Sequence, residues 1–301
     1  MKQTKLVSYI VGLGLGLVVL VSWQWPSHKT RMVVCDVGQG DAILIIKERL
    51  QVLVDGGPST AKVLACLEQY VPFWDRTIEL IVLTNTDFDH MNGLSAVLDR
   101  YEVIQFVTAD GAHESAALDK FIDSLDRNGV DVQAVERGDW LVVGGGERDS
   151  QLRFEVIWPP ETKRENVAIF GAQLSENDRK QILGASAKAG NRNERSVVLM
   201  LLEDTKRILL SGDIGDQTEE ELIEMGGLEN IDILKVGHHG SKYASTEEFL
   251  EILQPEIAVI SVGATNRYGH PTKETLERLS RIGARIYRTD LEGSIELSLS
   301  E

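Results

Sequence analysis

The sequence predicts a mixed α/β (α+β) fold in which two mixed β-sheets carry helices on their outer faces, preceded by one N-terminal transmembrane helix. Three observations lead to this prediction. Residues 6–23 form an uncharged apolar run, which is close to the minimum length for crossing a bilayer. From residue 32 onward, short apolar runs bounded by glycine-rich turns alternate with helical patterns. In each half of the chain, paired strands come before a strand–helix alternation, so each half is expected to form one mixed sheet.

Length and composition are those of a globular protein, whereas the charge is unusual. The chain has 301 residues, of which 43% are hydrophobic and 26% charged, so it can hold one large or two modest domains. The net charge is −16. An acidic surface argues against tight, nonspecific binding of a nucleic-acid backbone, which requires Lys and Arg. Local basic residues can still bind a single phosphate group.

The apolar run at residues 6–23 is predicted to be a membrane anchor. Lys2 and Lys5 precede it, and Trp23 and Trp25 lie at its far end, where indole rings favour the membrane interface. We therefore expect a single-pass protein of the cell membrane whose folded domain lies outside the cytoplasm.

The anchor divides the chain into four parts: a short cytoplasmic tail (1–5), the transmembrane anchor (6–23), a linker (24–30) and a folded domain (31–301). One observation weighs against this topology: Lys29 and Arg31 follow the apolar run and weaken the positive-inside bias. A cleaved signal peptide is the alternative, although residues 22–26 lack small residues at the paired positions that signal peptidase needs.

The two cysteines, Cys35 and Cys66, both lie in apolar sequence and do not form a CxxC pair, so a zinc knuckle is not expected. They are predicted to be a buried pair of thiols. One disulfide is the alternative if the domain lies outside the cytoplasm.

The first half of the domain is rich in predicted strands, and its glycine-rich turns indicate an antiparallel start. Strands are predicted at 32–36, 42–47, 51–54, 78–83, 103–107, 132–135, 140–143 and 152–157. Helices are predicted at 60–70, 93–101 and 115–127.

A polar stretch without sustained periodicity, 159–193, separates the two halves and is predicted to be a long surface excursion with one short helix at 176–183. Beyond it, strands are predicted at 196–202, 207–210, 231–236, 257–262, 284–288 and 294–299. Helices are predicted at 218–225, 246–253 and 272–282. The connection at 203–206 resembles a hairpin turn, and the last strand is expected to close the chain as a further hairpin.

One loop carries the strongest chemical pattern. The buried strand at 78–83 ends in a loop that holds Asp87, Asp89 and His90, and carboxylates with an imidazole at short spacing are ligands for Zn, Mn or Fe. An acidic turn in water is the alternative interpretation, because Asp-rich turns are usually that.

Other predicted strands also end in Asp or His, which favours the metal site. The strand at 207–210 leads to Asp213, the next to His238 and His239, and a later one to His270. Taken separately, these residues could cap a turn or lie in a surface loop. Because ligand sites of sheet proteins lie beyond strand ends, four such strands predict one shared cluster.

Jointly, these stretches resemble the metallo-β-lactamase superfamily and, more narrowly, the metallo-hydrolase domain at the C-terminal end of ComEC-type DNA-uptake proteins. The matching stretches occur in the family's order across nearly all of 31–301: 36–42, 54–57, 87–93, 193–199, 210–214, 234–241 and 261–271. The resemblance implies an αββα metallo-β-lactamase sandwich with the metal site at one edge, between the sheets.

The resemblance also assigns ligands residue by residue. The metal ligands that it implies are Asp87, Asp89, His90, Asp213 and His239. Asp213 matches the carboxylate that bridges two metal ions, and His239 is preferred to His238 as the last ligand. His238 is then expected to face the substrate.

The two halves of the implied site are unequal. Asn85 stands at the first position of the loop motif, where the family has a histidine, and Asn193 lies in the region of the superfamily's middle histidine. Both are weaker candidates for a metal or substrate contact, because an amide oxygen is a weak, neutral ligand. We therefore expect one zinc or manganese ion, with two ions as the alternative.

Further roles follow from the resemblance. Asp87 or Asp213 accepts the proton of the attacking water, and His238 and His270 stabilise charge on the leaving oxygen or on phosphate. The residues expected to bind an anionic substrate are Lys242, Arg267 and Tyr268, although Lys242 and Arg267 could equally be solvated surface residues. The residues expected to orient a ligand histidine are Asp55 and Ser211. Asp41 is expected only to cap a turn.

The resulting prediction is a membrane-anchored, metal-dependent hydrolase of phosphate esters, with phosphodiesters as the expected substrates and DNA as one candidate. Two alternatives remain. The chain could be a degenerate, non-catalytic binding module, which Asn85 favours and the intact Asp213 disfavours. It could also hydrolyse another ester or a lactam.

Overall fold

The computed structural model describes residues 29–109, 116–145, 150–160 and 193–300, together with four isolated positions, 9, 11, 14 and 16. Apart from those four positions, the predicted anchor at 6–23 falls outside the described residues, as does the predicted helix at 176–183. Across the part of the chain that is described, no helix is both long and apolar enough to cross a membrane. The anchor and the short helix stay predictions.

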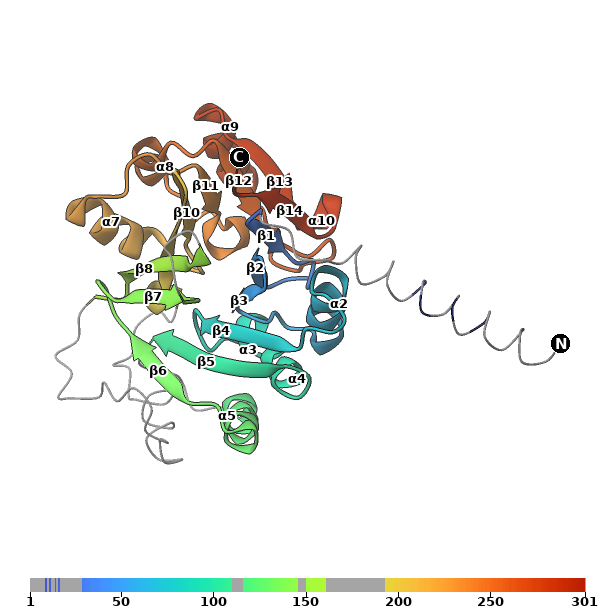
Figure 1. Ribbon diagram of the computed structural model, residues 1–301. Coiled ribbons are helices and arrows are strands. Elements are labelled where there is room, and N and C mark those ends of the chain that lie inside the picture. Colours follow the sequence, from blue (N-terminus) through green and yellow to red (C-terminus); the bar gives the residue numbers. More distant parts are fainter. Residues whose placement is uncertain are drawn as a thin grey trace.

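Two seven-stranded mixed sheets form the domain (Figure 1). Sheet A contains β1 (Arg31–Val34), β2 (Ile43–Lys47), β3 (Leu50–Val54), β4 (Thr77–Leu83), β5 (Glu102–Ala109), β6 (Val132–Val135) and β14 (Ile295–Ser298). Sheet B contains β7 (Trp140–Val143), β8 (Leu152–Trp158), β9 (Val198–Glu203), β10 (Lys206–Leu210), β11 (Ile233–Lys235), β12 (Ile257–Ile260) and β13 (Arg285–Arg288). The strand orders are β14-β1-β2-β3-β4-β5-β6 and β13-β12-β11-β10-β9-β8-β7.

The two sheets have the same internal plan. In sheet A the pairs from β14 to β3 are antiparallel and those from β3 to β6 are parallel. In sheet B the pairs from β7 to β10 are antiparallel and those from β10 to β13 are parallel. The predicted loose repeat, paired strands followed by a strand–helix alternation, is therefore confirmed.

Helices cover the outer face of each sheet (Figure 1). Beside sheet A lie α2 (Thr60–Tyr70), α3 (Phe88–Met91), α4 (Leu94–Leu98) and α5 (Ala116–Asn128). Beside sheet B lie α7 (Asp216–Met225), α8 (Glu247–Leu253) and α9 (Lys273–Arg281). The short segments α10 (Thr289–Glu292), η2 (Asn193–Arg195) and η3 (Gly237–Gly240) complete the described elements.

The alternation of side chains along each strand separates three apolar layers. In β2, Ile43 and Ile45 pack between the sheets, whereas Leu44 packs against the helices beside sheet A. In β9, Leu199 packs between the sheets and Met200 against the helices beside sheet B. Successive strand residues point to opposite faces, so both faces of each sheet are buried and the predicted αββα arrangement is confirmed.

Two local expectations are wrong. The helix expected at 93–101 is shorter, α4 at Leu94–Leu98, and it is preceded by a helix that was not expected, α3, which begins at Phe88 within the metal loop. The last strand does not form a hairpin with β13. After α10 the chain crosses to sheet A, where Ile295 in β14 pairs antiparallel with Val34 in β1. Such a long-range pairing cannot be read from local turn signals.

A disulfide joins Cys35, which follows β1, to Cys66 in α2. Both residues are buried, with exposed fractions of 0% and 5%. Of the two states considered for these cysteines, the structure has the disulfide. It ties α2 to the end of β1, where the loop at 36–41 begins.

Reducing this disulfide is expected to lower the free energy of unfolding by about 2–4 kcal/mol, because the bond closes a long loop in the unfolded chain. Its cysteines are separated by 31 positions. Urea unfolding with and without reductant measures the difference, and a Cys35→Ala/Cys66→Ala variant, which should not respond to reductant, is the control. A change well under 1 kcal/mol would contradict the expectation.

Candidate metal centre

The loops that follow β3, β4, β10 and β11 meet at one edge of the sandwich. These strands carry parallel pairings within their sheets, so their carboxyl ends lie at the same edge of each sheet. Asp55 follows β3, the loop with Asp89 and His90 follows β4, Asp213 follows β10, and His239 follows β11. Predicted positions that are far apart in sequence are thereby brought together.

Asp55 holds the loop after β4 in place through three contacts. Its Oδ1 accepts from the Thr84 backbone N–H at 2.7 Å, and its Oδ2 accepts from the Thr84 hydroxyl at 2.7 Å. The same Oδ2 is 2.7 Å from Nδ1 of His90. A carboxylate that accepts from Nδ1 leaves Nε2 as the ring nitrogen available to a metal. Asp55 therefore lies where it was expected, behind a candidate ligand histidine.

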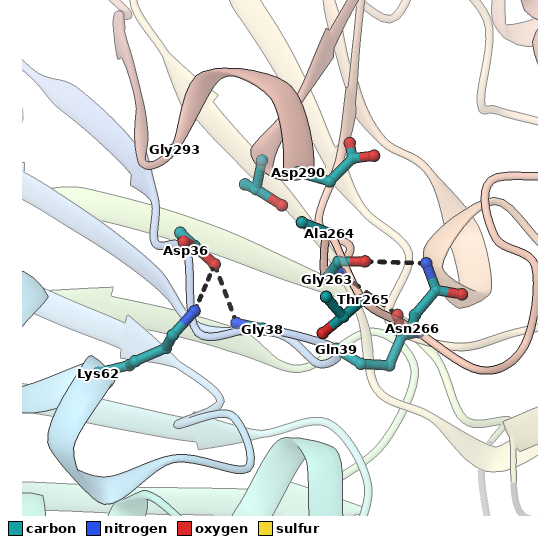
Figure 2. Close-up of a pocket in the computed structure, with 11 residues that line it drawn as sticks. Asp36, Gly38, Gln39, Lys62, Gly263, Ala264, Thr265, Asn266, Asp290 and Gly293 are labelled. Carbon is teal, nitrogen blue, oxygen red and sulfur yellow. Dashed lines mark hydrogen bonds and ion pairs between the residues drawn. The ribbon is translucent and has the colours of Figure 1, made fainter.

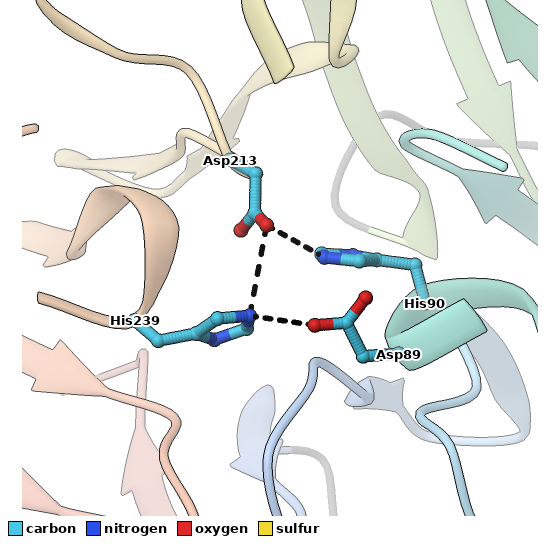
Figure 3. Close-up of side chains that lie close together, drawn as sticks. All are labelled: Asp89, His90, Asp213 and His239. Carbon is cyan, nitrogen blue, oxygen red and sulfur yellow. Dashed lines mark ion pairs between the residues drawn. The ribbon is translucent and has the colours of Figure 1, made fainter. Parts of the chain in front are cut away.

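Four side chains converge in the centre, as Figure 3 shows. One ligand atom from each of Asp89, His90, Asp213 and His239 lies within 4.8 Å of the others. Oδ2 of Asp213 is 3.0 Å from Nε2 of His90 and 3.6 Å from Nε2 of His239. Nε2 of His239 is 3.5 Å from Oδ2 of Asp89. Asp213 therefore lies between the two imidazoles and joins the two halves of the fold.

Three polar atoms of this group make no hydrogen bond of good geometry to the described residues, and the two nitrogens among them face only the carboxylates of the group itself. They are Nε2 of His90, Nε2 of His239 and Oδ1 of Asp213, and all three are buried. Buried polar atoms without partners are costly unless a ligand or an ion satisfies them. Two imidazole nitrogens and two carboxylates are also a donor set that suits Zn or Mn. The four residues thus fit one divalent cation.

The electrostatics of the metal-free group are consistent with this fit. Burial acts to lower the pKa of His239, but Asp213, Asp41 and Asp89 outweigh it and raise that pKa to about 10. Burial also acts to lower the pKa of His90, but the neighbouring carboxylates of Asp213 and Asp55 raise it well above 6.5. Both imidazoles then carry an extra proton at neutral pH. These two protons supply the positive charge that a divalent cation would supply.

The His238–His239 turn has an unusual backbone. Both residues have positive φ, 45° and 54°, which is uncommon outside glycine and persists only where the surroundings hold it. Gly40 lies so close to the metal loop that a Cβ at its position would be 2.1 Å from the Asp89 backbone oxygen. The loop at 36–41 therefore packs directly against the metal loop.

The positions expected to form a second metal site are arranged differently. Asp87 is not part of the four-residue group, and its backbone N–H donates to Oδ1 of Asn85 at 2.9 Å. The amide of Asn85 also donates to Ser196 Oγ at 3.2 Å. Asn193 lies beside His238, with Nδ2 3.2 Å from Nε2. In the described residues, the amide of Asn85 is therefore engaged in holding the loop.

A second set of side chains is connected to the four-residue group through His238, whose ring lies 6.3 Å from that of His239. The ring of His270 is 5.8 Å from that of His238 and stacks on Tyr268 at 5.9 Å. Tyr268 is 70% exposed, and Arg267 is also exposed. Lys242 is exposed with its ammonium 4.8 Å above the ring of Tyr243. The residues predicted to bind substrate thus lie on exposed loops, in two separate stretches of chain.

Two residues have contacts that differ from the expectation. The hydroxyl of Ser211 donates to the Lys235 backbone oxygen at 2.5 Å, so it holds the end of β11 rather than a histidine. Asp41 does not cap a turn: its carboxylate is buried, 2.8 Å from Nζ of Lys235 and 3.4 Å from Nδ1 of His239. Lys235 was missed in the sequence, although a lysine inside an apolar strand signals a buried acidic partner.

A pocket of about 270 Å³ lies beside the loop at 36–41 (Figure 2). Its walls include Asp36 and Lys62, which form an ion pair at 3.0 Å, and Asn266. The side chain of Asn266 also bonds the backbone of His270 through both its nitrogen and its oxygen. None of the four converging residues lines this pocket, so it is separate from the candidate metal centre.

Comparison with known proteins agrees with the fold. The model of the metallo-beta-lactamase superfamily matches residues 35–170. ComE operon protein 3 of Bacillus subtilis (strain 168) is 28% identical over 278 residues, which cover 87% of this chain and 32% of that protein. The chain spans about a third of the length of the curated relatives it matches, 28–33%.

Two solved structures show the same fold. The metallo-beta-lactamase fold protein YhfI from Bacillus subtilis superposes with a TM-score of 0.54 at 10% identity, covering 89% of this chain and 99% of that one. Zn(2+)-bound PqqB from Methylobacterium extorquens has a TM-score of 0.53 at 13% identity, covering 89% and 100%. The predicted resemblance to the superfamily and to ComEC-type proteins is confirmed.

Proposed function

We propose that this chain, a metallo-β-lactamase-fold protein of the ComEC type, is a membrane-anchored, metal-dependent hydrolase of phosphodiesters. The observation that carries the proposal is the convergence of Asp89, His90, Asp213 and His239 in a buried group whose two free imidazole nitrogens face only the group's own carboxylates among the described residues. A buried group of this composition fits a divalent cation with a position open to water.

The chemistry divides between the ion and the chain. When bound, a divalent cation acts as a Lewis acid that polarises the scissile phosphoryl group and lowers the pKa of adjacent water. We assign proton acceptance from that water to Asp213 or Asp87. The pKa of His270 is lowered to about 4 by burial and by His238 and His239, so its ring is neutral at pH 7. His270 and His238 are assigned to hydrogen-bond the phosphoryl or leaving oxygen.

The substrate class is inferred from the surroundings of the group. Lys242, Arg267 and Tyr268 are exposed on the neighbouring loops and offer cations and an aromatic face to an anionic ester. The net charge of −16 disfavours a broad grip on a nucleic-acid backbone, so we propose recognition of a short phosphodiester segment. The resemblance to ComEC-type DNA-uptake proteins supports DNA as one candidate source of that segment.

The location is inferred from two features. The apolar run at 6–23 supports a membrane anchor. The disulfide between Cys35 and Cys66 supports an oxidising compartment. We therefore propose that the folded domain lies outside the cytoplasm.

One observation favours a second candidate function, a non-catalytic binding module. Asn85 replaces an imidazole, and its amide is bonded to Ser196 and to the Asp87 backbone. With one of the two family sites short of a ligand, the chain would bind metal without hydrolysing an ester.

The test uses the full chain purified in detergent. Metal content is measured by elemental analysis, and hydrolysis is followed on a chromogenic phosphodiester, a carboxylic ester and a β-lactam with added Zn²⁺ or Mn²⁺. The proposal expects bound metal with preferential phosphodiester hydrolysis. Bound metal without any hydrolysis supports the binding module, hydrolysis of another substrate alone rejects phosphodiesters, and no metal with no activity rejects the proposal.

Replacing Asn85 with histidine is expected to raise the metal content from about one to about two ions per chain, because imidazole is a stronger ligand than an amide for these ions. Elemental analysis after dialysis against Zn²⁺ measures the change. Asn85→Ala, which loses the same hydrogen bonds without adding a ligand, is the control and should stay near one ion. If Asn85→His also stays near one ion, Asn85 does not belong to the ligand set.

A further inference from the structure

Lys235 is buried between the two sheets, next to the metal centre. It ends β11, and its side chain is 0% exposed. Ile233 packs between the sheets and Leu234 on the outer face, so alternation places Lys235 between the sheets. Its Nζ lies 2.8 Å from Oδ2 of Asp41 and donates to the Val236 backbone oxygen at 2.8 Å. A buried ammonium is stable only with such partners.

The Asp41 carboxylate has a second oxygen that faces the metal centre. Oδ1 lies 3.4 Å from Nδ1 of His239 and has no hydrogen-bond partner among the described residues. Nδ1 is also 2.9 Å from the Ser261 backbone oxygen. A carbonyl oxygen only accepts, so Nδ1 carries the proton and Nε2 is the nitrogen that points towards Asp213 and Asp89.

A metal ion between Asp41, Asp55 and His90 is the competing interpretation, because their ligand atoms also lie within 4.8 Å of one another. Two contacts argue against it. The ammonium of Lys235 already lies 2.8 Å from Asp41, and Nδ1 of His90 is bonded to Asp55. The ammonium of Lys235 therefore supplies, next to Asp41, the positive charge that a metal ion would otherwise supply.

We propose that Lys235 and Asp41 are positioning residues for the metal centre. The ammonium fixes the Asp41 carboxylate so that its second oxygen faces Nδ1 of His239, and this contact, with Ser261, fixes the ring tautomer and orientation that present Nε2 to the cation. The inference rests on the proposed function, since it assigns a role towards the same metal. It adds a link between the sheets, because Asp41 precedes β2 in sheet A and Lys235 ends β11 in sheet B.

The chain contains a matched control, a second buried lysine that joins the two sheets. Lys47 in β2 lies 2.8 Å from Glu203 in β9, and both side chains are nearly inaccessible. Neither residue belongs to the groups of candidate metal ligands. Removing either lysine leaves a buried carboxylate unpaired and should lower stability. Only removal of Lys235 should change the orientation of the His239 ring and, with it, the affinity for a metal ion.

The experiment measures the Zn²⁺ dissociation constant of the full chain by chelator competition, well below the unfolding temperature of every variant. Lys235→Met and Asp41→Asn are expected to weaken binding about 10–100-fold, the range for residues that orient a metal ligand, whereas Lys47→Met changes it less than about threefold. Nitrogen NMR of the His239 ring in the zinc-bound protein supplies a second readout, in which Asp41→Asn should shift the Nδ1 resonance, because that N–H loses its charged neighbour, whereas Lys47→Met should leave the resonance in place.

The outcomes separate this inference from the proposed function. If the wild-type chain binds no metal, the proposed function fails. If the wild type binds metal, and Lys235→Met and Asp41→Asn bind it as tightly with an unchanged His239 ring, the pair is merely structural and the inference is overturned. Asp41→Asn keeps the side-chain volume and carries the test on its own if Lys235→Met does not fold.

Discussion

Replacing Asp213 with asparagine is expected to reduce metal affinity at least about 100-fold, more than the loss of a residue that only orients a ligand, and to abolish hydrolysis. Asp213 is the one carboxylate of the group that lies close to both imidazoles, at 3.0 Å from His90 and 3.6 Å from His239. An amide removes the negative charge and one acceptor oxygen. The change therefore weakens the contacts of His90, which follows a strand of sheet A, and of His239, which follows a strand of sheet B.

The fold itself should survive this substitution. In the metal-free protein, Asp213 sustains the raised pKa of both histidines, so without it they can lose their extra protons instead of remaining buried and unpaired. Asp216→Asn is the matched control, because Asp216 is an exposed residue three positions further along the chain. Calorimetric metal titration and phosphodiester hydrolysis measure both variants. An Asp213→Asn protein that binds and turns over like Asp216→Asn would remove Asp213 from the site.

The strands and the converging loops were predictable because they depend on local patterns. An apolar run such as β4 that stops at Asp and His residues shows where a strand ends and what lies beyond it. The same reasoning placed Asp213 and His239 at strand ends, and the structure brings them together with His90. Alternation of inner and outer residues, as in β2 and β9, then separated the layers.

Features that depend on distant partners were not predictable. β14 pairs with β1 across almost the whole length of the domain. The role of Asp41 was mistaken because its sequence surroundings are a glycine-rich turn, whereas its partners Lys235 and His239 arrive from the other sheet. A lysine in an apolar strand predicts only that a buried acidic partner exists, not which one it is.

Metal binding is expected to release about two protons per ion at pH 7, one from each imidazole of the group. In the metal-free protein the pKa of His239 is about 10 and that of His90 lies well above 6.5. A cation must displace the proton on each Nε2 before it can bind there. Apparent affinity should therefore rise by about two log units per pH unit near neutrality.

Proton release is measured by calorimetric titration of Zn²⁺ in buffers that differ in ionisation enthalpy. Asp213→Asn is a useful comparison, because removing that carboxylate lowers the pKa of both histidines and should reduce the number of protons released. An affinity that is independent of pH between 6 and 8 would show that the imidazoles are not the ligands.

As pH rises, the metal-free protein should become less stable, whereas its affinity for the metal should increase. A histidine whose pKa is raised by folding stabilises the fold fully below its unfolded pKa, about 6.5, and loses that contribution as pH rises through its folded pKa. For His239 the window therefore runs from about 6.5 to about 10. The metal-bound protein lacks these protons and gains from tighter binding as pH rises. The difference in unfolding temperature between the two forms should widen from pH 6.5 to pH 9, because the protons that stabilise one form compete with the ion that stabilises the other.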